Sequence, residues 1–347
     1  MNDLGRKPKD RDFLRTVERM FFCVAGYLHP PQRFTAYLKY SPTAEGKWTG
    51  GGTAYRRELP YYHVQQVART VDALEERHPE YVHDCPVRGF RFSMVPRDRV
   101  AYYYRPEDRL QEILSEPRDS LEEEVRDLAL ELAASAGIHL TALGITGSVL
   151  IGIHNPGFSD IDLTVYGLGN AWKIREVLRG GMAPGVHPFS QDFVVAWSGG
   201  IARRFPLEAE DAQYFATRRW NYGTYNGRYF SLHPIRADNE ITEQYGDHIY
   251  RGHSSALVRA VVVDVTEALF MPAKYSVRGV EVLEGNPRAA EVEELVSYEG
   301  LYRDIVDDGG LVEARGWLES VDGEPRRLVI GSMAMGGQGF IKPMRAE

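Results

Sequence analysis

Cysteine is scarce in this chain of 347 residues, with only Cys23 and Cys85. The two lie far apart and form no C-x-x-C pair, so the sequence indicates neither a disulfide framework nor a zinc site. No window approaches the roughly 20 apolar residues of a membrane-spanning helix. The charged start, MNDLGRKPKDRDFLRT, lacks the apolar stretch of a secretory signal. We therefore expect a cytoplasmic protein with no membrane partner.

An excess of positive charge is also missing. The formal net charge is −8 and the pI is near 5.8, which argues against a surface that binds nucleic acid everywhere. Any site for a polyanion must be confined to part of the surface. The composition otherwise resembles that of an ordinary soluble protein, and the length favours two or three domains.

Residues 1–119 are expected to form an N-terminal α+β region. β-branched and aromatic residues recur between turn signals in 33–40 and 87–95, which predicts two strands. Apolar residues at helical spacing predict a helix over 64–74 between them. The glycine triplet at 50–52 indicates a flexible loop, because nothing beside it has the spacing of a phosphate-binding loop.

Residues 120–238 are expected to alternate helices and strands. Ser120 and Glu123 match a capping box, which predicts a helix that ends at Gly137. Strands are expected at 140–146, from Asp160 onward and at 228–235, and helices at 171–178 and 208–219. This order favours an α/β or α+β domain with helices on a mixed sheet.

Residues 239–347 read as a β-rich domain. Short strand-like runs recur there, and Asp322-Gly323 supplies a hairpin signal between the last two. One helix is expected near 289–298. A small β-barrel or sandwich is the natural inference, so the predicted fold class is α+β, with a mixed-sheet domain between an N-terminal α+β region and a barrel-like C-terminal domain.

The chemistry is expected in the stretch GSVLIGIHNPGFSDIDL, which begins at Gly147. In a strand, Asp160 and Asp162 point to the same face and lie about 6.6 Å apart along the strand. Carboxylates so placed can converge on hard cations such as Mg²⁺. Two metals roughly 3.5–4 Å apart can activate an attacking oxygen and stabilise a leaving pyrophosphate. Gly147 permits close backbone approach, and Ser148 offers a hydroxyl and an N–H to an anion.

These residues resemble the motif of the DNA polymerase beta-like nucleotidyltransferase superfamily, which has Gly-Ser, a spacer of about ten residues, and Asp-x-Asp between apolar residues. The resemblance extends over roughly 120–238, and the whole chain is similar to a group of predicted nucleotidyltransferases common in archaea. It implies that Gly147 and Ser148 bind the triphosphate of an NTP, with ATP as the expected substrate. It also implies that Asp160 and Asp162 bind Mg²⁺ or Mn²⁺.

The chain departs from the family at a third carboxylate, which active members generally carry on a later strand. The strand at 228–235 has no acid. Ser231 and His233 share a face there, and His233 could act as a base or donate to a phosphate; a satisfied structural histidine is the alternative. Other possible sources of the acid are Asp192, Asp238 and Glu240.

Cations and aromatics gather around this strand, and two of them, Arg218 and Arg228, are candidate nucleotide ligands. A packed aromatic core with paired arginines is an equally good interpretation. The sequence therefore predicts a nucleotidyltransferase that moves an NMP to an RNA or DNA end, a protein or a small molecule. A catalytically weak or inactive nucleotide- or nucleic-acid-binding module is the alternative, and AMP transfer to a regulated partner is a third possibility.

Overall fold

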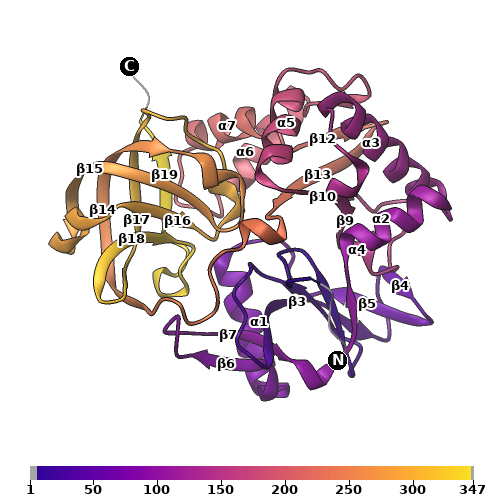
Figure 1. Cartoon of the computed structure of the whole chain (residues 1–347), viewed down its shortest axis with the longest axis horizontal. Helices are drawn as coiled ribbons and strands as arrows, with labels where there is room; N and C mark the ends of the chain where they lie inside the picture. Colours follow the sequence, from indigo (N-terminus) through magenta and orange to yellow (C-terminus); the bar gives the residue numbers. More distant parts are fainter. Residues whose placement is uncertain (1–5, 345–347) are drawn as a thin grey trace. The chain divides into compact units, whose positions relative to one another are not determined.

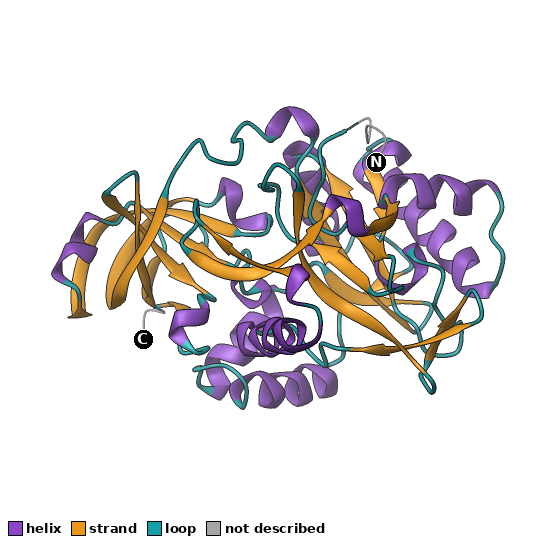
Figure 2. Cartoon of the chain, turned by 90° about the horizontal axis from the view of Figure 1, so that it is seen from below, coloured by secondary structure: helices purple, strands orange, loops and turns teal. Residues whose placement is uncertain are grey.

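The protein divides into two compact units. The computed structural model describes residues 6–344, which form helices, strands and three sheets (Figure 1). Unit 1 comprises 6–59, Ser93–Ser190 and Arg219–Thr242, and unit 2 comprises Pro60–Phe92, Gln191–Arg218 and 243–344. Helices and strands both recur along the described chain (Figure 2), which confirms the mixed α+β class. No helix of the described residues is long and apolar enough to cross a membrane.

The first sheet of unit 1 is antiparallel, with the order β4-β5-β3-β2-β1-β8. The expected strand over 33–40 is confirmed as β3, and the expected strand over 87–95 is confirmed from Phe90 onward. Gly51 and Gly52 take positive φ in the turn between β4 and β5, so the glycine triplet is a hairpin turn. The elements of unit 1 in this part of the chain are β1 (Phe13–Thr16), β2 (Phe21–Val24), β3 (Arg33–Thr43), β4 (Trp48–Gly50), β5 (Thr53–Arg57), β8 (Val100–Tyr104) and α2 (Pro106–Ser115). The strand β6 (Val82–Cys85) belongs to unit 2, and β7 (Phe90–Pro96), which pairs with β3 and β6, belongs to unit 1 from Ser93 onward.

The second sheet of unit 1 is mixed, as expected, with the order β11-β12-β13-β10-β9. β10 runs parallel to β13 and antiparallel to β9, and α5 packs against both β10 and β13. The elements are α3 (Ser120–Ala136), β9 (Leu143–Ile145), α4 (Gly147–Leu150), β10 (Ile161–Tyr166), α5 (Leu168–Arg179), β11 (Val186–His187), β12 (Tyr222–Tyr225) and β13 (Arg228–Ile235).

A buried apolar cluster joins the two sheets of unit 1. The first sheet contributes aromatic side chains from four strands, and the segment from α4 onward contributes Leu150, Ile151 and Ile153. Because these side chains exclude water together, the position of α4 depends on the first sheet as well as on its own sheet. The cluster comprises Phe13, Phe21, Cys23, Tyr40, Tyr55, Leu150, Ile151 and Ile153.

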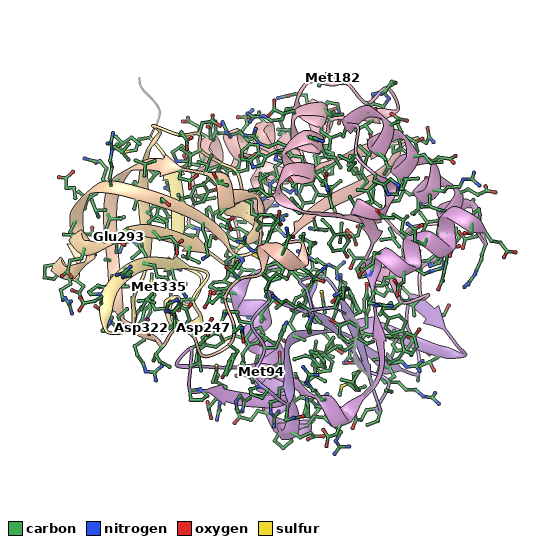
Figure 3. All side chains as sticks on the ribbon, viewed as in Figure 1. Met94, Met182, Asp247, Glu293, Asp322 and Met335 are labelled. Carbon is green, nitrogen blue, oxygen red and sulfur yellow. The ribbon has the colours of Figure 1, made fainter. Side chains whose placement is uncertain are left out.

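Unit 2 contains the third sheet and three helices. Pairing of β14 with β17 closes a ring of strands, β14-β15-β16-β18-β17, so the sheet is barrel-like (orange to yellow in Figure 1). Asp322, labelled in Figure 3, and Gly323 take positive φ in the β17–β18 turn, which confirms the expected hairpin. The elements are α1 (Val64–Arg77), α6 (Gln191–Ala202), α7 (Ala209–Arg218), β14 (Tyr250–Asp264), β15 (Ala273–Gly285), β16 (Glu294–Ser297), β17 (Leu311–Val321), β18 (Glu324–Ile330) and β19 (Phe340–Pro343).

Two local predictions are wrong. The N-cap of α3 is Asp119, not Ser120, because the Asp119 carboxylate accepts hydrogen bonds from the N–H groups of Leu121 and Glu122. The expected helix over 289–298 is a short 3₁₀ helix, η6 (Pro287–Glu291), followed by β16. β16 pairs with β15 on one edge and β18 on the other, and this ladder overrides the local helical spacing.

The two compact units do not coincide with the three consecutive regions expected from the sequence. Each expected range, 1–119, 120–238 and 239–347, does contain one of the three sheets. However, residues 60–92 belong to unit 2, where the N–H of Val64 donates to Glu299 and Arg88 donates to the Tyr298 hydroxyl. The helix α6 was not expected, because its apolar residues and Gly199-Gly200 show no helical period.

Glu299 provides a test of the burial of a carboxyl group in unit 2. Burial raises the pKa of Glu299 to about 7, above its ordinary value of about 4.3. The group therefore stabilises the fold fully below about pH 4.3, and this contribution is lost as the pH rises through 7. We expect Glu299→Gln, which keeps an acceptor for Val64, to gain about 3 kcal/mol relative to the wild type between pH 4.5 and 8.

Denaturant unfolding of the full chain across this pH range measures the gain. Glu324→Gln is the matched control, because the Glu324 side chain is 69% exposed. A constant difference between Glu299→Gln and the wild type across the range would contradict an ionisation cost at this position.

Candidate active site

The Gly147-Ser148 bend lies against Asp162. The N–H of Thr146 donates to the carbonyl of Asp162, 2.8 Å away, and Gly147 then begins α4 with a φ of +68°. A Cβ at position 147 would overlap Oδ2 of Asp162. Only glycine therefore allows both this backbone conformation and the close approach of the carboxylate. Ser148 is buried, with its Oγ 3.5 Å from Oγ of Ser159.

The two aspartates of the motif interact strongly. Asp160 is exposed just before β10, and Asp162 is the second residue of the strand. The negative charge of Asp162, with a smaller effect of burial, raises the pKa of Asp160 to about 6. Burial would also raise the pKa of Asp162, but His233, whose Nε2 lies 3.8 Å from Oδ1, the charge of Lys39 and a hydrogen bond from Ser231 hold it below its usual range. Crowded carboxylates of this kind are suited to a divalent cation.

Ser231 and His233 lie beside these carboxylates, as the sequence predicts. In the parallel pairing of β10 and β13, Asp162 stands opposite Ser231, and Thr164 opposite His233. The Ser231 hydroxyl donates to Oδ1 of Asp162, and Nε2 of His233 lies 2.9 Å from that hydroxyl. Because the single hydroxyl proton goes to Asp162, Nε2 of His233 acts as a donor to Ser231 in this arrangement. A catalytic role for His233 stays a prediction.

Two cationic side chains near the carboxylates were not predicted from the sequence. The charges of Lys39, in β3, and Arg57, at the end of β5, both lower the pKa of Asp160, and Lys39 also lowers that of Asp162. Lys39 is only 5% exposed, with Nζ 5.2 Å from the ring centroid of Phe13. The available signal was a lysine within the apolar run RFTAYLKY, but the sequence does not reveal that this strand faces the motif.

Arg228, a predicted nucleotide ligand, fastens the loop that precedes Asp160. Its guanidinium pairs with Glu124 at 2.7 Å and donates to the carbonyl oxygens of Ser159 and Pro156. Because the guanidinium is bound to the loop, Arg228 would contribute to nucleotide binding mainly by holding Asp160 in position.

Arg218, the other predicted nucleotide ligand, belongs to unit 2, where it forms an ion pair with Asp307 at 2.7 Å. Asp192, a possible third acid, is also in unit 2. In unit 1, Asp238 pairs with Lys9 at 3.1 Å, and Glu240 accepts from the N–H groups of Leu168 and Ala237. The structure brings neither Asp238 nor Glu240 into hydrogen-bonding contact with Asp160 or Asp162.

A second group of possible metal ligands comprises Asp119, Glu122 and His154. Nε2 of His154 lies 2.9 Å from Oδ2 of Asp119, while the other oxygen of Asp119 caps α3. Glu122 accepts from the Arg109 guanidinium through one oxygen and from the Arg118 N–H through the other. Since a guanidinium already neutralises Glu122, the group serves to hold the loop on α3.

A pocket of about 300 Å³ opens beside Asp160. The β12–β13 turn contributes one part of its wall, the loop before β10 another and α3 a third. It is lined by Glu124, Phe158, Ser159, Asp160, Asn226, Gly227, Arg228 and Tyr229. A ligand bound there would lie within reach of the Asp160 carboxylate.

A comparison with known proteins found a similar chain of archaeal origin. No family model and no solved structure matches this protein. It is similar to the uncharacterized protein MJ1086 of Methanocaldococcus jannaschii, with 29% identity over 351 residues that cover 98% of this chain and 100% of that protein. The likeness therefore spans both units, and the name of the relative gives no activity.

Two glycines with the same backbone conformation test the approach of Asp162 to the bend. Gly147→Ala and Gly152→Ala each place a Cβ at a φ near +68°, which costs about 1 kcal/mol of stability. Only the Cβ added at position 147 would meet Asp162, because nothing lies within 4 Å of a Cβ at 152. We expect a loss of Mn²⁺ affinity of about tenfold or more in Gly147→Ala alone, measured by electron paramagnetic resonance. Equal Mn²⁺ affinities of the two variants would refute this role for Gly147.

Proposed function

We propose that this protein is a metal-dependent nucleotidyltransferase with a polymerase beta-like domain in unit 1. The observation that carries the proposal is the approach of the Asp162 carboxylate to the Gly147 bend, with the charges of Asp160, Lys39 and Arg57 close enough to interact with one another. The mixed order β13-β10-β9, with the bend between β9 and β10, is compatible with such a domain. A cytoplasmic location belongs to the same proposal.

The residues fit a metal and a triphosphate. Two carboxylates supply hard oxygen ligands, and the raised pKa of Asp160 reflects negative charge that a cation would relieve. Bound Mg²⁺ or Mn²⁺ would supply neutralising charge for the phosphates and for the attacking oxygen. The Ser231 hydroxyl fixes Oδ1 of Asp162, which leaves Oδ2 directed at the bend. Lys39 and Arg57 would offset the charge of an NTP, expected to be ATP.

In the proposed reaction, an acceptor oxygen forms a bond to the α-phosphorus of the NTP, and the bond to pyrophosphate breaks. Gly147 and Ser148 would orient the triphosphate for this in-line displacement. The acceptor is an RNA or DNA end, a protein side chain or a small molecule. His233 would support the site through Ser231 and Asp162.

A second candidate is a nucleotide- or nucleic-acid-binding module with weak or no catalysis. The observation that favours it is Ser231, which occupies the position beside Asp162 on β13 where the resemblance implies an acid. Binding of an NTP without incorporation into pooled RNA, protein or small acceptors would support this module. Labelled protein rather than labelled RNA would indicate AMP transfer to a partner.

Substitution of either aspartate tests the proposed enzyme. We expect Asp160→Asn and Asp162→Asn each to lower nucleotide incorporation at least 100-fold, because removal of one key electrostatic contact commonly costs that much. Labelled NTPs with Mn²⁺ and pooled acceptors provide the measurement. Asp127→Asn is the control, since Asp127 is exposed on α3 and pairs with its neighbour Arg126. Incorporation that survives both active-site substitutions would rule out the proposed enzyme.

Two adjacent arginines, Arg56 and Arg57, test the contribution of the first sheet to phosphate binding. We expect Arg57→Gln to weaken binding of ATP with Mn²⁺ about tenfold, because one charge-assisted contact to a phosphate would be lost. Arg56→Gln should have no effect, since Arg56 is exposed and pairs with Glu58 at 2.9 Å. Isothermal titration calorimetry measures both affinities, and equal losses in the two variants would speak against phosphate binding by Arg57.

A further inference from the structure

Two half-exposed aromatic side chains flank the pocket beside Asp160. Phe158 and Tyr229 are each 49% exposed, although both are large enough to be stabilised by burial. Phe158 contacts the Trp48 ring edge to face at 5.9 Å, and Tyr229 contacts the Phe189 ring at 5.8 Å. The supporting rings hold both aromatics in defined positions, so the pocket offers flat surfaces that need little ordering to bind a ligand.

The polar groups of the pocket favour a ligand without phosphate charge. Glu124 and Arg228 neutralise each other as an ion pair at 2.7 Å, which leaves the Asp160 carboxylate as the net charge of the lining. Lys39 and Arg57 are not among the lining residues. A polyphosphate would thus be repelled from this pocket, whereas a neutral planar group would not be.

The turn between β12 and β13 adds hydrogen-bonding groups at the same place. Asn226 and Gly227 have φ values of 50° and 80°, which form a tight turn and leave Asn226 exposed at the pocket. An asparagine amide offers both a donor and an acceptor, and this combination matches the edge of a nucleobase. Aromatic surfaces with an amide at the rim are typical of base recognition by stacking.

We propose that this pocket binds the nucleobase of a nucleoside, with Phe158 and Tyr229 as its stacking surfaces and Asn226 at the base edge. This inference rests on the proposed function, because it gives the nucleoside part of a substrate a place next to Asp160. The base belongs either to the NTP or to the terminal nucleotide of a nucleic-acid acceptor, and the two sources share this chemistry.

Inorganic tripolyphosphate and ATP separate the base from the phosphates. If the base is that of the NTP, the wild type with Mn²⁺ should bind ATP about tenfold more tightly than tripolyphosphate, since stacking of one base contributes on that order. Phe158→Ala and Tyr229→Ala should then each remove most of this difference and leave tripolyphosphate affinity unchanged, which also shows that the variants are folded. Tyr102→Ala is the matched control, because Tyr102 is 54% exposed in β8 and does not line the pocket.

A second titration identifies the source of the base. A trinucleotide RNA with a free 3′ hydroxyl is added to protein saturated with Mn²⁺ and tripolyphosphate. A loss of RNA affinity in Phe158→Ala and Tyr229→Ala, with ATP unaffected, assigns the pocket to the acceptor; the converse assigns it to the NTP. Both results support the pocket.

A failure of the base pocket and a failure of the proposed metal and phosphate site give different results. If neither substitution changes the affinity for ATP or for RNA, the base pocket is overturned even when tripolyphosphate still binds. If tripolyphosphate with Mn²⁺ fails to bind, or binds equally to Asp162→Asn, the proposed metal and phosphate site fails. The base pocket then stands only if adenosine alone binds the wild type at least tenfold more tightly than both aromatic variants; otherwise it falls as well.

Discussion

The position of the Asp162 carboxylate is the constraint on which the site depends. Gly147 contacts one of its oxygens at a distance that leaves no room for a Cβ, and the Ser231 hydroxyl donates to the other. The parallel register of β10 and β13 fixes the second contact, and the positive φ of Gly147 permits the first. A shift of one residue in that register would turn Ser231 to the opposite face of the sheet.

Charge balance around this carboxylate comes from two sheets. Asp162 lies in the second sheet and Asp160 just before it, while the first sheet supplies Lys39 and Arg57, which offset part of the repulsion between the aspartates. A site with four charged groups near one another can bind an anion and a cation together, because each reduces the cost of desolvating the other. Under the proposed function, this electrostatic pairing would suit a metal nucleotide better than a free metal or a free phosphate.

The sequence predicts those parts of the site that lie within one short segment. The alternation in DIDLTVY places the aspartates on a common face, and the spacing of Gly147 and Ser148 indicates the bend. Ser231 and His233 follow from the same alternation in β13. Lys39 and Arg57 could not be found in this way, because their proximity arises from packing of distant strands on Leu150, Ile151 and Ile153. The helix expected at 289–298 failed for a similar reason: distant strands β15 and β18 decide its conformation.

The apolar cluster between the two sheets of unit 1 also bears on how such a site diverges among related chains. A segment limited to 120–238 would carry the whole motif but neither Lys39 nor Arg57, and it would expose Leu150 and Ile153 to water. The motif therefore depends on residues outside the segment that contains it. Substitutions of Lys39 in β3 or Arg57 in β5 would change the charge around Asp160 and Asp162, while every residue of the Gly-Ser and Asp-x-Asp pattern stays the same.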